Sequence, residues 1–260
     1  MIITSKDNEV IKNIRKLKEK KYRDETGSFI IEGIKIVEEA IEENADINKI
    51  VVCNELTETM PQELLNKIKK YDVIFASQNV FKLLSDVTNP QGILAVVNKN
   101  KNASIDFSQD FYLILDNIQD PGNMGTILRT ADSINLKQII VAKCSADCYN
   151  PKVVRSTMGA IFRVKVFECD LAQTIDELKK HKIKILATDL NTNSNIYDTD
   201  YERTAVVIGN EANGVSQEIL NLADERIKIP MLGRTESLNA GVATGIILYE
   251  TVRKRLYGKK

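Results

Sequence analysis

The chain has 260 residues, of which 43% are hydrophobic, so it is long enough to build one large or two ordinary domains with real cores. Its 36 basic and 36 acidic residues cancel, so no overall charge indicates a nucleic-acid binder, and any basic region has to be local. The single histidine, His181, argues against a His-based triad and against a histidine metal site, and we expect no metal.

No segment has the pattern of a signal peptide or of a membrane span. The N-terminal residues lack a basic stretch followed by an apolar one, and no stretch approaches the ~20 apolar residues of a spanning helix. The four cysteines have neither the spacing of a disulfide framework nor that of a zinc or iron–sulfur site. We therefore expect a soluble cytoplasmic protein with reduced thiols.

The chain begins with a basic helical pattern. Residues 6–23 combine an apolar stripe with a series of basic residues that includes Lys12, Arg15, Lys16, Lys18, Lys20, Lys21 and Arg23. On this pattern alone, a solvated helix face is favoured over a nucleic-acid contact. The segments that follow are predicted as strand 29–31, helix 34–41, strand 47–53, helix 62–70, strand 73–76, helix 80–84 and strand 93–97. This alternation predicts a small α/β sandwich over residues 1–98.

A polar run without periodicity, residues 99–107, is the predicted linker to a second domain over residues 108–260. Its predicted elements are strand 111–115, a helix ending at 135, strand 137–142, a helix capped by Asn150 with Pro151 first and Gly159 near its end, strand 162–167, helix 171–181, strands 183–188 and 205–208, helix 217–222, strand 226–229 and helix 238–257 capped by Ser237. This order predicts an α/β fold with a mostly parallel sheet covered on both faces.

Three unusual segments follow the ends of predicted strands, where ligands of such sheets bind. They are residues 120–129, 209–214 and 229–239. None contains a dinucleotide-binding GxGxxG sequence or a P-loop. A conventional nucleotide-binding enzyme is therefore disfavoured.

Together these segments resemble the three motifs of the SpoU (TrmH) family of RNA ribose 2′-O-methyltransferases. Asn123-x-Gly-x-Ile-x-Arg129 is similar to the first motif, Gly209-Asn-Glu211-x-x-Gly214 to the second, and Ile229-Pro-Met231-x-Gly233-x-x-x-Ser237-Leu-Asn239 to the third. The resemblance covers residues 108–257 and includes the stretch 155–160, with small departures at residues 213, 240 and 241. It implies a deep trefoil knot of the SPOUT type, S-adenosyl-L-methionine as cofactor, and a homodimer formed through this domain.

The N-terminal region also has a counterpart. Its Ser5-Lys6-Asn8 opening and Phe29-Ile-Ile-Glu-Gly33 resemble the RNA substrate-binding domain that precedes many ribosomal-RNA members, a fold related to kink-turn-binding ribosomal proteins. This resemblance favours an RNA contact by the basic helix. The residues assigned to that contact are Lys16, Lys18, Lys20 and Lys21.

The resemblance also implies roles for the motif residues. The backbone around five residues is expected to line the cofactor pocket: Thr188, Gly209, Ile229, Met231 and Leu238. The candidate catalytic residue is Arg129, with Glu211 expected to orient it and Asn123, Ser237 and Asn239 to fix the ribose or the arginine. A guanidinium keeps its proton below about pH 12, so we favour an arginine that grips the adjacent phosphate over one that acts as a base.

The predicted function is S-adenosylmethionine-dependent 2′-O-methylation of a ribose in RNA, in particular 23S ribosomal RNA. One alternative is the same reaction on tRNA. A second is a non-catalytic RNA-binding or ribosome-assembly module, against which Arg129, Glu211 and Asn239 argue because all three are present. A small-molecule α/β enzyme has no other recognisable set of residues to support it.

Overall fold

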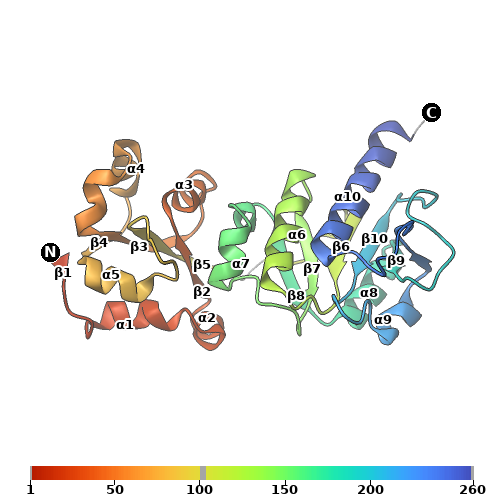
Figure 1. Ribbon diagram of the computed structural model, residues 1–260, viewed down its shortest axis with the longest axis horizontal. Coiled ribbons are helices and arrows are strands. Elements are labelled where there is room, and N and C mark those ends of the chain that lie inside the picture. The colour runs from red at the N-terminus through yellow and green to blue at the C-terminus, as the bar shows by residue number, and fades with distance from the viewer. Residues whose placement is uncertain (1, 100–103, 259–260) are drawn as a thin grey trace. The chain divides into compact units, whose positions relative to one another are not determined.

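The structure, a computed structural model, describes residues 2–99 and 104–258. The chain forms two compact units, shown in Figure 1: an N-terminal unit of Met1–Asn102 with Asp147–Phe162, and a C-terminal unit of Ala103–Ala146 with Arg163–Lys260. The chain thus passes from one unit to the other three times. Of the predicted linker, residues 100–103 lie outside the described residues.

The N-terminal unit contains a five-stranded mixed sheet. Its strands, in spatial order, are β1 (Ile2–Ile3), β4 (Val73–Ala76), β3 (Ile47–Cys53), β5 (Ile93–Asn98) and β2 (Ser28–Glu32). The first three are parallel, and β5 runs antiparallel to both β3 and β2. The helices are α1 (Glu9–Lys16), α2 (Lys20–Thr26), α3 (Ile34–Glu42), α4 (Gln62–Ile68) and α5 (Gln78–Leu84), with a 3₁₀ helix, η1, at Asn54–Thr59.

Both faces of this sheet are covered. Successive side chains of β3 point to opposite faces, so Ile50 packs in one core with α3 and α4, while Val51 packs in the other with α1 and α5. Burial on both faces explains why the strand is a continuous apolar run. The predicted α/β sandwich is confirmed, and β3 and β4 have the predicted bounds.

The prediction of one helical segment across residues 6–23 is wrong. Helix α1 ends at Lys16 and α2 begins at Lys20. The interruption frees the carbonyls of Leu17 and Lys18, and Arg23 Nη1 donates to both, over 2.8 and 2.7 Å. Arg23 is therefore a structural residue, 2% exposed, and does not belong to the basic surface.

A segment between the second and third crossings completes the N-terminal unit. It holds α7 (Pro151–Ser156) and a 3₁₀ helix, η2 (Ala160–Phe162). The predicted cap is confirmed, because Asn150 Oδ1 accepts the N–H of Lys152, with Pro151 as the first helical residue. Val154 enters the core on the α3 side of the sheet, and the rings of Tyr149 and Phe29 lie 4.9 Å apart. The segment is thus packed as an integral part of this unit.

The C-terminal unit is built on a six-stranded, entirely parallel sheet. Its order is β11 (Glu225–Ile227), β9 (Lys184–Thr188), β10 (Thr204–Ile208), β6 (Phe111–Leu115), β7 (Gln138–Ala142) and β8 (Lys165–Cys169). The helices are α6 (Pro121–Ser133), α8 (Leu171–Lys180), α9 (Gln217–Leu222) and α10 (Ala240–Tyr257). The predicted parallel sheet is confirmed, with β8 starting three residues after the predicted position because η2 occupies Phe162.

Helices cover the buried sheet of this unit. Residues Tyr112 and Ile114 of β6 share a core with α8 and α9, while the alternate residue Leu113 is equally buried on the opposite face. Helix α10 lies against α6 (Figure 1), and a Cβ at Gly241 would come within 3.1 Å of Thr126 Cγ2. Within the described ranges, no helix is both long and apolar enough to cross a membrane.

Candidate functional site

Four neighbouring parallel strands, β11, β9, β10 and β6, end at the same edge of the C-terminal sheet. Thr188 is the last residue of β9, Gly209 follows β10 directly, and Ile229 stands two residues beyond β11. Met231 and Leu238 lie in the segment that leads from β11 to α10 and are partly exposed. The residues predicted to line the cofactor pocket therefore lie at the carboxyl ends of adjacent strands or in the segments that follow them, the usual ligand position in such sheets.

A chain of side-chain hydrogen bonds joins the three motif segments. Asn123 Nδ2 donates to Glu211 Oε1 over 2.9 Å, and Asn239 Nδ2 donates to Asn123 Oδ1 over 2.8 Å. Glu211 also accepts the backbone N–H groups of Gln119 and Asp120. The Asn123 amide is thus held in one orientation, because one end donates to a carboxylate and the other accepts from an amide.

The same residues organise the starts of two helices. Asp120 Oδ1 accepts the N–H of Asn123 and caps α6, and Asn239 Oδ1 accepts the N–H groups of Gly241 and Val242 and caps α10. The predicted cap at Ser237 is therefore wrong, and α10 begins at Ala240. Asn239 is the better cap here because its amide also reaches Asn123, which a serine hydroxyl at 237 does not.

Glu211 is held as a carboxylate. Burial alone would raise its pKa, but the hydrogen bonds from Asn123 and from backbone N–H groups outweigh burial and hold the pKa below its usual value near 4.5. Because the pKa of Glu211 is lower in the folded protein than in the unfolded chain, these hydrogen bonds stabilise the fold at pH values above the unfolded-state pKa of Glu211. That stabilisation is lost as the pH falls through the lowered folded-state pKa.

Arg129 lies on α6, six residues beyond Asn123, with its side chain exposed. Its guanidinium makes no hydrogen bond or ion pair with any described residue, so the expected contact between Glu211 and Arg129 is absent from this structure. Glu211 instead bonds to Asn123 and to the backbone before α6. Ser237 is also exposed and, within residues 2–99 and 104–258, makes no side-chain hydrogen bond. Hydrogen bonds therefore unite Asn123, Glu211 and Asn239 and leave Arg129 and Ser237 free to meet a ligand.

Sequence reasoning missed a second set of polar contacts between the same loops. Asp116, 5% exposed, accepts the N–H of Ser216 over 2.7 Å, and Asn210 Nδ2 donates to the carbonyl of Asn117 over 2.9 Å. Asn117 has a positive φ of 61°, a conformation that asparagine adopts more readily than most residues. An Asp-Asn pair directly after a buried strand was the available signal. These contacts fix the loop after β6 to the loop after β10.

Gly209 lies where the second motif turns back on itself. The N–H of Asn210 donates to the carbonyl of Gly214, and the N–H of Gly214 donates back to Asn210, both over 2.9 Å. A Cβ at residue 209 would lie 2.1 Å from the backbone of Gly214 and Val215. Glycine is therefore required because the backbone of the loop occupies the position of a side chain.

We expect Gly209→Ala to lower the free energy of unfolding by about 1–3 kcal/mol and to weaken cofactor binding, since the loop from 210 to 215 has to move. Gly245→Ala is the matched control, because Gly245 lies outside the three motif segments and a Cβ there would make only an ordinary contact, 3.9 Å from Thr130 Cγ2. Urea unfolding and calorimetric titration with S-adenosylmethionine measure both effects. Equal stability and affinity for the two variants would show that the tight turn is not required.

The four lysines assigned to RNA binding differ in their surroundings. Lys16, Lys20 and Lys21 are exposed. Lys18 is half-buried, and its Nζ donates to the carbonyl of Ser85 over 2.8 Å and lies 2.9 Å from an Asp86 carboxylate oxygen. Lys18 thus holds α1 to the end of α5, and three of the four predicted lysines present their charges to solvent.

Comparisons with known proteins agree with this geometry. Residues 110–249 match the SpoU rRNA Methylase family, and residues 8–95 match the MRM3-like substrate binding domain. The chain is 33% identical over 248 residues to the 23S rRNA (guanosine(2553)-2'-O)-methyltransferase RlmP of Bacillus subtilis. The alignment covers 95% of this chain and 97% of RlmP. It is 29% identical over 303 aligned residues to the mitochondrial rRNA methyltransferase 3A of Danio rerio, across 96% of this chain and 69% of the relative.

Solved structures give the same result. The AdoMet-bound rRNA methyltransferase from Sinorhizobium meliloti is 30% identical, with a TM-score of 0.85 and 98% of each chain covered. The SpoU methyltransferase AviRb from Streptomyces viridochromogenes, in complex with AdoMet, is 27% identical, with a TM-score of 0.88, 97% of this chain covered and 100% of AviRb. The resemblance inferred from the three motifs and from the N-terminal region is confirmed, and the chain belongs to the SpoU rRNA methylase family.

Proposed function

We propose that the protein transfers a methyl group from S-adenosylmethionine to a ribose 2′-hydroxyl in 23S ribosomal RNA. The observation that carries the proposal is the hydrogen-bonded chain from Glu211 through Asn123 to Asn239, because it joins all three motif segments at one sheet edge. RlmP, whose name specifies 23S rRNA, aligns over nearly the whole chain. A TrmH/SpoU tRNA modifying enzyme of A. aeolicus covers only 57% of the chain, with a TM-score of 0.50, which favours ribosomal RNA over tRNA.

The strand-end loops fit a cofactor of this kind. The position of a side chain at 209 is filled by backbone, so the loop presents main-chain groups there, and Leu232 is 99% exposed in the segment before α10. Main-chain donors and acceptors beside apolar side chains suit an adenosine and the aliphatic chain that carries its sulfonium. Thr188, Gly209, Ile229, Met231 and Leu238 would hold the cofactor. When bound, S-adenosylmethionine supplies an activated methyl group and its own leaving group.

The protein's task is then to place the ribose and favour loss of its proton. Arg129 is exposed and its guanidinium has no partner among the described residues, so it is available to bind a phosphate next to the target ribose and to stabilise the developing oxyanion. Asn123, Glu211 and Asn239 set the start of α6, on which Arg129 stands, relative to the start of α10. Ser237, exposed in the segment before α10, would contact the ribose itself.

The basic surface of the N-terminal unit is proposed to contact the RNA backbone. We expect replacement of Lys16, Lys20 and Lys21 by glutamine to weaken RNA binding and to reduce the slope of log K against log salt by roughly 2, since each phosphate contact releases counterions. Lys18→Gln is the control, because Lys18 is committed to Asp86 and Ser85. Fluorescence anisotropy over a salt series measures the slopes. If the slope of log K against log salt is unchanged in the triple variant, these lysines do not contact RNA and form an ordinary solvated surface.

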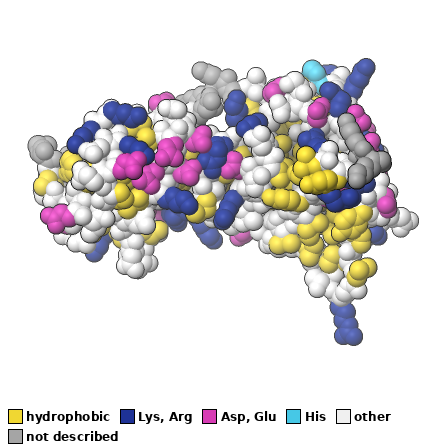
Figure 2. Space-filling model, turned by 90° about the horizontal axis from the view of Figure 1, so that it is seen from above, with side chains coloured by type: hydrophobic (Ala, Val, Ile, Leu, Met, Phe, Trp, Pro, Cys, Tyr) yellow, Lys and Arg dark blue, Asp and Glu magenta, His cyan; other side chains and the backbone are white. Residues whose placement is uncertain are grey.

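Dimerisation through the C-terminal domain is also part of the proposal. Val242, Tyr249 and Leu256 recur at intervals of seven residues on α10 and are 52–67% exposed, so the helix presents an apolar stripe to solvent. Figure 2 shows hydrophobic side chains gathered on the displayed face of this unit. A second copy of the chain would cover the stripe. The trefoil knot and a cytoplasmic location complete the proposal, both drawn from the family resemblance.

Methyl transfer tests the proposal directly. The protein is incubated with radiolabelled S-adenosylmethionine and total RNA, and the labelled RNA is separated by size and hydrolysed with alkali. We expect label in 23S RNA, in a dinucleotide that resists alkali because its 2′-hydroxyl is methylated. Label confined to tRNA would show that tRNA is the substrate instead of 23S RNA. No label in any RNA would favour a non-catalytic binding module.

A further inference from the structure

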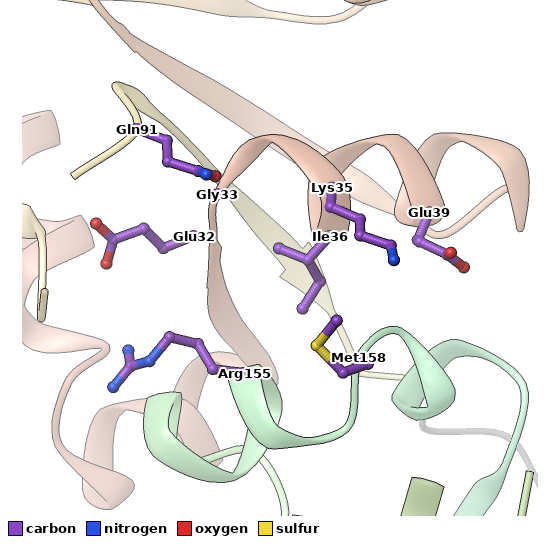
Figure 3. A pocket seen from close by; sticks show the side chains of 8 residues that line it. All are labelled: Glu32, Gly33, Lys35, Ile36, Glu39, Gln91, Arg155 and Met158. Carbon is purple, nitrogen blue, oxygen red and sulfur yellow. The ribbon is translucent and has the colours of Figure 1, made fainter. Parts of the chain in front are cut away.

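The N-terminal unit contains a pocket of about 220 Å³, shown in Figure 3, and none of its lining residues belongs to the three motif segments. Its lining includes Glu32, Lys35, Ile36, Gln91, Arg155 and Met158. The first three stand at the end of β2 and the start of α3, and the last two on and after α7. Pockets for drug-sized ligands have ~300 Å³ or more, so this pocket has room for one small ring system.

Arg155 brings an unused donor to this pocket. Its Nη1 atom is buried and has no hydrogen-bond partner, and no described residue forms an ion pair with the guanidinium. Figure 3 shows Arg155 and Glu32 extending to the same side of the pocket from opposite walls. Glu32 is held in place, because its carboxylate accepts from Ser85 Oγ and from the N–H of Asp86. A buried donor of this kind ordinarily has an acceptor, and the open side of the pocket is where a ligand would provide it.

Met158 gives the pocket an apolar surface. Its side chain is 45% exposed although methionine is ordinarily buried, and its backbone has a φ of 51°, which disfavours a residue with a side chain. Gly159 follows with a φ of 91°, and a Cβ there would lie 2.9 Å from a carboxylate oxygen of Glu39. This turn directs Met158 toward Ile36, as Figure 3 shows. The left-handed conformation directly after the C-cap of α7 ends the helix and leaves the Met158 side chain at the pocket.

The charges of the lining select the class of ligand. Glu32 and Glu39 balance Lys35 and Arg155, so a phosphate here would face two carboxylates. A nucleobase instead combines apolar faces with donors and acceptors along its edge. Gln91 adds a further donor, because its Oε1 accepts the N–H of Ile34 while its Nε2 has no partner among the described residues. We propose that this pocket receives one unstacked base of a single-stranded RNA segment, a proposal that rests on RNA being the substrate.

Methionine methyl signals provide the test. The full chain is labelled with ¹³C at its methionine methyl groups, and Met158 is identified by the signal missing from Met158→Leu. Single-stranded RNA octamers of A, C, G or U are then added in turn. We expect at least one octamer to shift the Met158 signal while Met60, buried in the core, stays unchanged. Arg155→Gln should raise the dissociation constant of that octamer about tenfold, the effect of losing one hydrogen bond from a charged donor.

Lys67→Gln is the matched control, since it removes one positive charge from the same unit outside the pocket. The Met60 signal in each variant shows that the unit remains folded. The inference is overturned if every octamer that binds leaves the Met158 signal unmoved, if Arg155→Gln binds as Lys67→Gln does, or if a base-free ribose-phosphate oligomer moves the signal equally. If the protein methylates RNA but no octamer shifts the Met158 methyl signal, only the base-binding role of the pocket is refuted. A responding Met158 without methylation would refute the proposed function alone.

Discussion

Replacing Arg129 by alanine should reduce methyl transfer at least about a hundredfold, the usual effect of removing one donor that stabilises a developing oxyanion. The folded protein should be unaffected, because Arg129 is exposed and bonds to no described residue. We therefore expect an unchanged unfolding midpoint and an unchanged dissociation constant for S-adenosylmethionine. Single-turnover transfer to 23S RNA, with calorimetry for the cofactor, measures both quantities.

Arg203→Ala is the control for this variant. Arg203 directly precedes β10, at the edge of the sheet opposite to the motif loops, and its guanidinium donates to the carbonyl of His181. The Arg203→Ala substitution therefore removes one positive charge from the same unit and leaves the motif loops unchanged. Near-normal transfer by Arg129→Ala, or an equal loss in both variants, would remove Arg129 from the catalytic assignment.

Arg129→Lys separates two roles for the residue. An arginine that grips a phosphate acts through its charge and its paired donors, so lysine should retain part of the activity, with no pH dependence of its own. An arginine that removes the hydroxyl proton acts as a base. Lysine in that role would gain activity as the pH rises toward its ordinary pKa of about 10.4. The pH profile of the lysine variant therefore decides between a phosphate clamp and a general base.

Much of the fold could be predicted because its strands are locally distinct. Strand β6 is an entirely apolar run bounded by Asp110 and Asp116, and its predicted bounds are those observed. The interruption between α1 and α2 could not be predicted, because it depends on Arg23, whose partner Asp147 lies 124 positions away. Strand β1, with two residues, is defined only by its pairing with β4. Local patterns thus predicted elements, while distant side-chain contacts determined where some of them end.

The candidate site shows the same division. Asn123, Glu211 and Asn239 could be selected from their three motifs, but their hydrogen bonds span 88 and 116 positions, and no motif specifies which residue of another motif is its partner. The choice between Ser237 and Asn239 as the cap of α10 also depends on such a contact, because both residue types cap helices well. The sequence therefore does not predict which polar side chains form hydrogen bonds with each other.

The contact between Arg23 and Asp147 carries the second large effect. Arg23 Nε donates to an Asp147 carboxylate oxygen over 2.9 Å, and Nη2 donates to the same oxygen. Nη1 meanwhile binds the two carbonyls freed between α1 and α2. One buried guanidinium therefore secures both the helix break and the start of the segment that carries α7. Since α7 holds Arg155, this ion pair also supports a wall of the proposed base pocket.

Arg23→Met should lower the free energy of unfolding by about 3–5 kcal/mol, because it leaves Asp147 without its partner in a largely buried site. Lys67→Met, which breaks the surface pairs with Glu63 and Glu42, should change the free energy of unfolding much less. Combining Arg23→Met with Asp147→Leu should restore part of the loss, since no uncompensated charge remains. Recovery should be incomplete, because the carbonyls of Leu17 and Lys18 still lack a donor.

Urea unfolding of the single and double variants gives the coupling energy, and limited trypsin digestion reports on the segment itself. Cleavage after Lys152, within the first turn of α7, should accelerate in Arg23→Met and remain slow in Lys67→Met. An Arg23→Met protein as stable and as resistant to trypsin as the control would show that Val154 and Tyr149 alone hold the segment in the unit. The ion pair would then orient Asp147 without contributing to stability.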